Sequence, residues 1–211
     1  KQRNALLRRG KIDSNLLAPW ERQLTQSGQV VDTLRRTVFE RLYRLFLERL
    51  GDLPEAVFGD LDIHYRSGWK KDLGLAEALQ LAREGDAAQG FTRVGPHRAD
   101  IRFVIHGEPA HAVLSRGQQK MAVCALRTAM ASTVEGNQRP VFLVDDLPSE
   151  LDRTNQALFA RWVSSCASQV LVTGIDHQET ARPWRALPSP WCEPKMFHVE
   201  HGEVSAKEIA R

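Results

Sequence analysis

Apolar residues recur every seven positions in the first quarter of the chain, and some repeats carry a second apolar position. The residues of this pattern are Leu17, Leu24, Val31, Val38 and Leu45, with Trp20 and Leu34 at the interleaved position. This period predicts a helix over residues 16–50 with a coiled-coil-like seam. The pair Ser27-Gly28 predicts an interruption within it.

A second apolar stripe begins in the last third of this helix. Its members are Phe39, Tyr43, Phe46 and Leu50. Two stripes on one helix predict burial on two sides. Gly51 and Pro54 follow as a stop signal.

Shorter patterns alternate along the rest of the chain. The expected strands cover residues 61–65, 91–94, 101–105, 141–144 and 169–173. The expected helices cover residues 73–83, 115–131 and 153–165, the last two with Ser115 and Asp152 as N-caps. "MFHVEHGEV" predicts a hairpin that turns at His201-Gly202. A helical arm followed by alternating helices and strands predicts an α/β core with a helical insertion.

The composition is that of an ordinary globular protein, with 42% apolar and 26% charged residues among 211. No apolar run approaches the length of a membrane span, and "KQRNALLRRG" has no apolar signal core. The three cysteines Cys124, Cys166 and Cys192 form no C-x-x-C pair. Their odd number predicts reduced thiols and a cytoplasmic protein.

Charge is unevenly distributed along the chain. Residues 1–50 hold 11 Lys/Arg against five Asp/Glu, whereas the whole chain has a net charge of only +3. A basic arm on a slightly acidic body permits contact with nucleic acid. The candidates for contact with DNA phosphates are Arg35, Arg36, Arg41 and Arg44. A solvated, Arg-rich helix is an equally good interpretation of the same residues.

"VFLVDD" has the form of a buried strand that ends in two acids. Placing Asp145 and Asp146 there costs several kcal/mol unless something neutralises them. A divalent cation would satisfy the first acid, and the second could accept a proton from an attacking water. A strand that runs into an acidic turn would give the same letters.

"LSRGQ" places Ser115 and a flexible Gly117 at the start of a helix. The unpaired amides at such a start suit phosphate oxygens. By itself this stretch could equally be a well-capped helix.

The two stretches in this order are a more specific signal of a protein family than either stretch alone. The chain contains "LSRGQ", then about 22 residues of helix and turn, then the acidic strand, and then "SELD". This order resembles the ATP-binding-cassette (ABC) ATPases, in which LSGGQ is the signature and SALD the D-loop. The chain also resembles the bacterial RecF family, which is related to Rad50 and SMC proteins. The stretches that carry this resemblance are "GPHRAD", "LSRGQQK", "VDDLPSELD" and "MFHVEHG". The resemblance implies an ABC/SMC-like ATPase lobe over 91–211 and a helical arm with lobe II over 1–90.

The resemblance also implies roles for single residues. Asp145 matches the Mg²⁺-binding acid, and Asp146 the general base, where most of the superfamily has Glu. The signature, which contacts the γ-phosphate held by the opposite subunit, is Ser115, Arg116, Gly117 and Gln118. The D-loop, which crosses the dimer interface, is Ser149, Glu150, Leu151 and Asp152. The usual switch histidine is missing near Thr173, and His177 lies three residues late, so that role stays open.

The turn Pro96-His97-Arg98 is a hallmark of the resembled family. A role at the nucleotide or at the subunit interface is one interpretation, and a structural turn with surface charges is the other. No stretch fits the phosphate-binding loop G-x-x-x-x-G-K-[ST]. The family carries that loop before the arm, so we expect Mg²⁺·ATP to be seated on an N-terminal lobe. Without that lobe the chain should be inactive, and residues 141–144 and 169–173 should expose sheet edges.

The function implied by the resemblance is a slow ATPase that closes as an ATP-dependent homodimer over double-stranded DNA. Such a clamp would mark gaps or single–double-strand junctions and, with RecR and RecO, help to load RecA in recombinational repair and the SOS response. It would be cytoplasmic and associated with the nucleoid. Another SMC/Rad50-like repair ATPase is one alternative. A non-catalytic module that binds DNA or a protein is an alternative of a different class.

Overall fold

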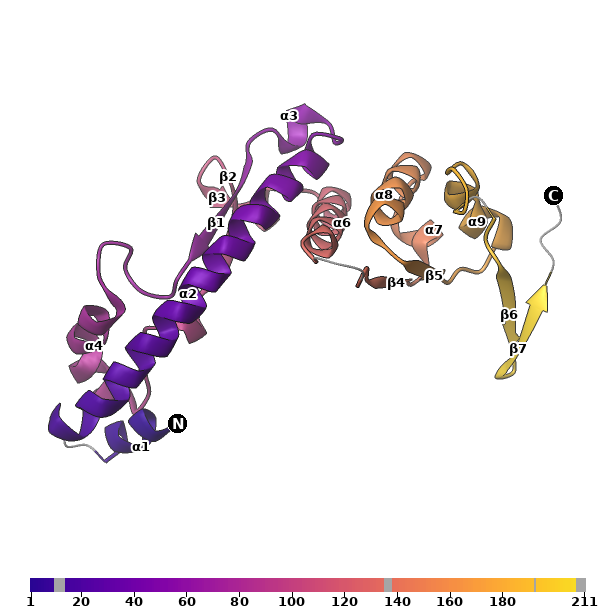
Figure 1. The fold of residues 1–211 in the computed structure, drawn as a ribbon. Coiled ribbons are helices and arrows are strands. Elements are labelled where there is room, and N and C mark those ends of the chain that lie inside the picture. Colours follow the sequence, from indigo (N-terminus) through magenta and orange to yellow (C-terminus); the bar gives the residue numbers. More distant parts are fainter. Residues whose placement is uncertain (10–13, 135–137, 192, 208–211) are drawn as a thin grey trace. The chain divides into compact units, whose positions relative to one another are not determined.

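The computed structural model describes residues 1–9, 14–134, 138–191 and 193–207 (Figure 1). Its contacts divide the chain into two compact units. The first comprises Lys1–Tyr43 and Asp60–Val113, and the second Arg44–Gly59 and Leu114–Arg211. The expected division between residues 90 and 91 stays a prediction about functional lobes, and residues 60–113 form one part of the first unit across it.

The first unit is built on residues 14–43 of the long helix α2, Ser14–Leu50, whose last residues belong to the second unit. The short helix α1, Gln2–Leu7, precedes α2. The expected interruption at Ser27-Gly28 is wrong, because α2 continues through both residues. A β-carbon at Gly28 would lie 2.6 Å from Cδ2 of Leu75 and 3.3 Å from Cγ of Pro96. Glycine therefore serves close packing here and does not break the helix.

The heptad seam of α2 is not its buried face. Leu34 and Val38 are 62% and 56% exposed, and only Leu17 of the seven predicted residues is buried. The buried positions in the first two thirds of α2 are Leu17, Glu21, Gly28 and Asp32. The pattern failed because charged residues occupy this face and find partners inside the unit. Of the second stripe, Phe46 and Leu50 are buried, whereas Phe39 and Tyr43 are half-buried.

A buried ion network joins α1 and α2 to α4, Leu75–Gln89. Arg3 contacts Glu21 at 3.1 Å and Asp86 at 2.8 Å, and all three side chains are less than a tenth exposed. Arg83 donates to both carboxylate oxygens of Glu21. Burial alone would raise the pKa of Glu21, but the hydrogen bonds from Arg83 and Arg3 outweigh it and lower that pKa.

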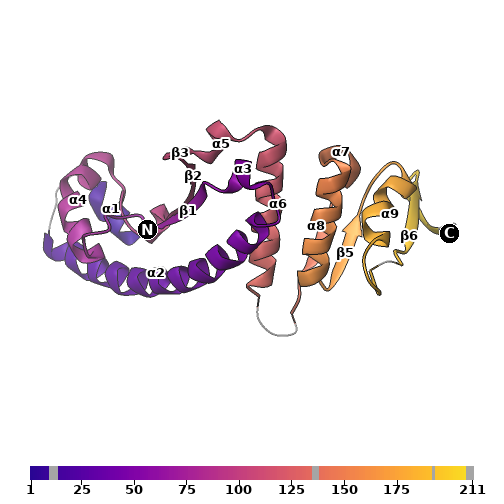
Figure 2. The ribbon, with the colours of Figure 1, turned by 90° about the horizontal axis from the view of Figure 1, so that it is seen from above.

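An antiparallel sheet completes the first unit. Its order is β1 (Leu61–Arg66), β2 (Asp100–Ile105) and β3 (Glu108–Pro109), followed by the short helix α5 (Ala110–Val113). Leu61 pairs with Ile105, and Tyr65 donates to Asp32 of α2 at 2.9 Å. Figures 1 and 2 show α1 and α4 beside the N-terminal half of α2.

The strand expected at 91–94 does not form. The Thr92 amide donates to Asn4 Oδ1 at 3.1 Å, and the Arg93 amide donates to Asp86 Oδ1 at 3.1 Å. Side chains thus take the hydrogen bonds that a ladder would need. A 3₁₀ turn, η1 (Pro96–Arg98), follows this segment.

The second unit contains most of the remaining helices and a parallel strand pair (Figure 1). The helices are α3 (Glu55–Phe58), α6 (Arg116–Ser132), α7 (Leu147–Glu150), α8 (Arg153–Cys166) and α9 (His177–Arg185). The strands are β4 (Val141–Val144) and β5 (Gln169–Val172), with Val141 opposite Gln169. Trp162 and Val163 of α8 lie in its core, and the Trp162 indole donates to Asp52 at 2.6 Å.

The expectation that residues 141–144 form a buried strand is wrong for this chain. Leu143 is 77% exposed, Val141 51% and Leu171 of β5 49%. The physical reason is that, within the described ranges, the sheet has two strands only, so part of its apolar surface lies open. Within the described ranges each of the two strands also has one unpaired edge, as expected.

The predicted C-terminal hairpin is confirmed as β6 (Met196–Glu200) and β7 (Glu203–Lys207). Glu200 pairs with Glu203, and the two turn residues His201 and Gly202 have φ of 49° and 85°. Positive φ at both positions is typical of a two-residue hairpin turn.

No helix in the described ranges is both long and apolar enough to cross a membrane. Cys124 and Cys166 are free thiols, as expected, and Cys192 lies outside the described residues.

Candidate nucleotide site

The start of α6 is a capping box, as the sequence predicts. The amide of Gln118 donates to Ser115 Oγ at 3.3 Å, and the Ser115 amide donates to Gln118 Oε1 at 2.7 Å. Two otherwise unpaired donors are satisfied in this way. The capping box fixes where the helix begins and thus where its positive end lies.

The residues at this helix start are accessible. Ser115, Arg116 and Gly117 are exposed, and Gln118 is half-buried. A β-carbon at Gly117 would meet no atom within 4 Å. The space in front of the helix start is therefore open to an anion.

The two acids follow β4 directly, and neither is buried. Asp145 is exposed and Asp146 is half-buried. Asp146 has φ 45° and ψ 48°, a left-handed conformation that Asp tolerates better than most residues. The expected desolvation cost is therefore absent from this chain, because the sheet that would bury the acids is open here.

One hydroxyl connects both acids. Thr173 Oγ1 donates to Asp145 Oδ1 at 2.5 Å and accepts from the Asp146 amide at 2.9 Å. The Thr173 amide donates to the carbonyl of Val144 at 2.9 Å. Sequence reasoning gave Thr173 no role. The role could have been found from the parallel pairing of the two strands. The carboxyl ends of adjacent parallel strands lie side by side, which places the residue after the second strand next to the acids after the first.

The donor set fits a magnesium ion held partly by nucleotide. No cluster of three or more His, Cys, Asp or Glu side chains suited to a metal occurs among the described residues. Mg²⁺ commonly takes only one or two protein carboxylates and completes its shell with water and phosphate oxygens. A single exposed carboxylate such as Asp145 matches that requirement.

The D-loop residues also make contacts within their own unit. Ser149 Oγ donates to Asp146 Oδ2 at 2.5 Å, and Asp152 caps α8 by accepting from the Asn155 amide at 3.0 Å. Glu150 forms an ion pair with Lys120 of α6 at 2.5 Å. This pair connects the predicted D-loop to the helix of the predicted signature.

A pocket of about 540 Å³ brings Arg116 of the signature and Asp145 together in one lining. It lies between α6 and β4, and Val123 and Leu143 supply apolar walls. The second unit therefore places the two predicted motifs at one cavity.

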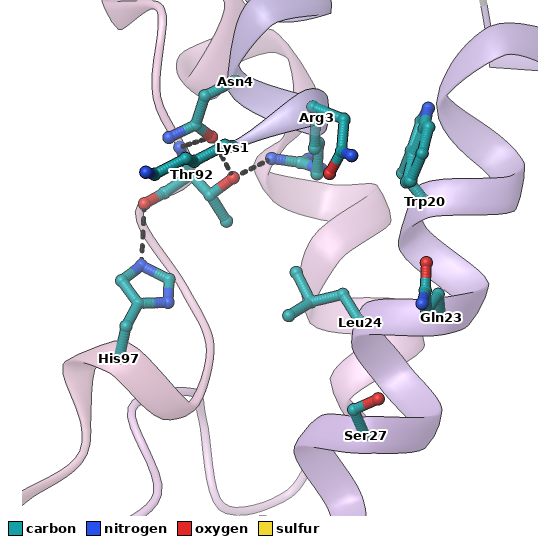
Figure 3. A pocket seen from close by; sticks show the side chains of 10 residues that line it. Lys1, Arg3, Asn4, Trp20, Gln23, Leu24, Ser27, Thr92 and His97 are labelled. Carbon is teal, nitrogen blue, oxygen red and sulfur yellow. Dashed lines mark hydrogen bonds between the residues drawn. The ribbon is translucent and has the colours of Figure 1, made fainter.

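His97 and Arg98 belong to the first unit. His97 Nε2 is 2.9 Å from the Thr92 carbonyl, and Arg98 lies over the Phe91 ring at 5.9 Å from its centroid. Figure 3 shows His97 and Thr92 at a pocket of about 440 Å³ that Trp20 of α2 also lines. Both residues have structural contacts, and their functional role stays a prediction.

The candidate DNA-binding arginines have varied surroundings. Arg35 donates to the Pro96 carbonyl at 2.6 Å. Arg36 pairs with Asp32 at 2.8 Å and lies over the Tyr65 ring. Arg41 lies in the first unit and is half-buried, whereas Arg44 lies in the second and is exposed.

His177 is the first residue of α9 and is exposed. The helix is capped by Asp176, which accepts from the amides of Gln178 and Glu179. These two bonds lower the pKa of Asp176. Within the described residues, His177 makes no hydrogen bond to Asp145 or Asp146.

The parallel strand pair that ends in two acids lies in the same unit as the helix that begins at Ser115, as expected for an ABC/SMC-like ATPase lobe. The chain belongs to the RecF/RecN/SMC N terminal domain family, whose model matches residues 1–185. Both the predicted fold class and the predicted likeness to RecF are thereby confirmed.

Curated relatives agree with this family. The DNA replication and repair protein RecF of Cellvibrio japonicus (strain Ueda107) is 39% identical over 208 residues, which are 97% of this chain and 56% of the relative. The protein of that name from Pseudomonas aeruginosa (strain LESB58) is 41% identical over 207 residues, 97% of this chain and 54% of the relative. The chain thus spans about half the length of these relatives.

Solved structures support the fold. A structure of the recombination mediator protein RecF-ATP in the RecFOR pathway superposes with a TM-score of 0.73 at 22% identity. The match covers 98% of this chain and 55% of that one.

Proposed function

We propose that this chain is the signature and acid-bearing part of a RecF-like ATPase that acts in DNA repair. The relatives named DNA replication and repair protein RecF support the process. The observation that carries the chemistry is the exposed, capped start of α6 in the same unit as the two acids after β4, of which Asp145 is exposed and Asp146 half-buried.

In this proposal Asp145 would hold Mg²⁺, and the ion would supply positive charge to the phosphate oxygens of ATP. Asp146 accepts the proton of the attacking water. Asp is one methylene shorter than Glu, so its carboxylate reaches the water less well and turnover is slow. ATP then works as a dimerisation switch rather than as fuel for rapid cycling.

The signature completes the site of a second subunit. The helix start at Ser115 presents backbone donors and a positive dipole end to the γ-phosphate bound by the partner. Arg116 adds a charge that suits phosphate, and Gly117 leaves room for it. The D-loop crosses the same interface. ATP would thereby be held by two protomers, with the phosphate-binding loop supplied by a part of the protein outside this chain.

The substitution Ser115→Arg in the full-length protein tests the dimer. Losing the cap costs about 1 kcal/mol, which is small against a total stability of about 5–15 kcal/mol. The fold and ATP binding by the monomer should survive. ATP-driven dimers should be lost in light scattering, because a bulky cation occupies the phosphate-facing position.

Thr133→Arg is the matched control, since it adds the same charge at the opposite end of α6. This variant should dimerise like the wild type. Undiminished dimers of Ser115→Arg would contradict the assignment of the signature.

We further propose that the dimer closes on duplex DNA at gaps or single–double-strand junctions and acts with RecR and RecO to load RecA, in the cytoplasm and at the nucleoid. Arg44 is exposed, whereas Arg41 is half-buried and Arg35 and Arg36 are engaged by the Pro96 carbonyl and Asp32. Arg44 is therefore the best placed of the four candidate arginines for phosphate contact. Gel shifts at several salt concentrations, with and without ATP, test this. Binding that ignores nucleotide would instead favour a non-catalytic DNA-binding module.

A further inference from the structure

Thr173 lies directly after β5, at the position where the two parallel strands end together. Its amide continues the ladder by donating to the carbonyl of Val144 at 2.9 Å. Its side chain is therefore fixed in place beside the residues that follow β4. The hydroxyl then makes the two contacts described above, with Asp145 and with the Asp146 amide.

The contact with Asp145 orients that carboxylate. Asp145 is exposed, so packing does not select one rotamer for it. A 2.5 Å hydrogen bond to Oδ1 holds the group in one orientation and leaves Oδ2 for a cation. Within the described part of the chain, no hydrogen bond to Oδ2 is found. Partners of this kind orient metal ligands in many proteins.

The contact with Asp146 stabilises the turn that aims the second acid. Asp146 has a left-handed backbone, which costs about 1–2 kcal/mol for an L-residue. Its amide is satisfied by Thr173, and its Oδ2 accepts from Ser149 at 2.5 Å. One hydroxyl thus links the orientations of both acids.

We propose that Thr173 is a positioning residue that holds the cation-binding carboxylate of Asp145 in register with Asp146. His177, by contrast, lies at the start of α9 without a hydrogen bond to either acid among the described residues. This inference rests on the proposed function, because it requires that Asp145 binds a divalent cation together with a nucleotide.

The test measures cation binding rather than turnover. Mn²⁺ replaces Mg²⁺ in the full-length protein with a non-hydrolysable ATP analogue, and its dissociation constant is followed by electron paramagnetic resonance. Thr173→Val keeps the shape and removes the hydroxyl, so it should weaken Mn²⁺ binding by about 10- to 100-fold. Binding of the analogue without metal should not change. Thr173→Ser keeps the hydroxyl and should restore wild-type affinity.

Thr37→Val is the matched control. The Thr37 hydroxyl is exposed and donates only within α2, to the Thr33 carbonyl at 3.2 Å, so its loss should leave Mn²⁺ affinity unchanged. Should the valine variant at 173 fail to fold, Thr173→Ala removes the same hydroxyl and is interpreted in the same way.

Asp145→Asn separates the two hypotheses. If this variant loses Mn²⁺ while Thr173→Val binds it like the wild type, the role of Thr173 is refuted and the proposed function stands. If the wild type binds no Mn²⁺ with the analogue, or Asp145→Asn binds it unchanged, the proposed function fails and the inference fails with it.

Discussion

The open face of the β4–β5 pair predicts how a single leucine behaves in different lengths of the protein. Leu143 is 77% exposed in this chain. Full burial of a leucine is worth about 1.5–3 kcal/mol, so the remaining quarter of its surface contributes about 0.5 kcal/mol. Leu143→Ser should therefore change the stability of the 211-residue chain very little. If the rest of the protein covers this face, the same substitution should cost about 2–5 kcal/mol in the full-length protein.

Urea unfolding followed by circular dichroism measures both values. Leu81→Ser is the matched control, because Leu81 of α4 is 71% exposed and no covering element is proposed for it. It should cost less than about 1 kcal/mol in either length. Equal and small effects of the two substitutions in the full-length protein would show that nothing covers β4 and would contradict the expected sheet neighbours.

Three further outcomes are expected. Asp146→Glu in the full-length protein should raise the steady-state rate of ATP hydrolysis by about tenfold. This increase is part of the roughly 10²- to 10⁴-fold acceleration that a well-placed general base contributes. An unchanged rate would disprove our explanation of slow turnover. Asp86→Asn should lower the free energy of unfolding, measured by denaturant titration, by about 3 kcal/mol, because it leaves buried Arg3 without one of its two carboxylate partners. A decrease in this free energy of less than about 1 kcal/mol would mean that the ion network does not stabilise the fold. Burial raises the pKa of Cys124 to about 11 despite the nearby Arg127. Because the thiolate is the reactive form, alkylation of Cys124 at pH 8 should be on the order of 10²-fold slower than that of free cysteine. Mass spectrometry measures this rate, which should increase as the pH approaches about 11.

Local signals in the sequence predicted the ends of elements well. Ser115 and Asp152 cap their helices, α2 ends at Leu50 before Gly51, and the hairpin turns at His201-Gly202. Each of these features depends on hydrogen bonds or backbone angles within a few residues. Such features can be inferred without knowledge of the fold.

Features that depend on distant partners were missed. The buried face of α2 contains Glu21 and Asp32 because Arg3 and Tyr65 supply partners from other elements. A periodicity argument assigns such charged residues to solvent. Thr173 was missed for the same reason, since its partner Asp145 is 28 residues away and is reached only through parallel strand pairing.

The uninterrupted helix α2 restricts how this segment can change in length. Each inserted residue would turn everything after it by about 100° and advance it by about 1.5 Å. Leu17 and Leu42, both buried within the first unit, would then no longer face their present neighbours at the same time. Seven residues come within about 20° of two full turns. Length differences among homologues should therefore occur in steps of seven within α2, or be confined to the loops at its ends.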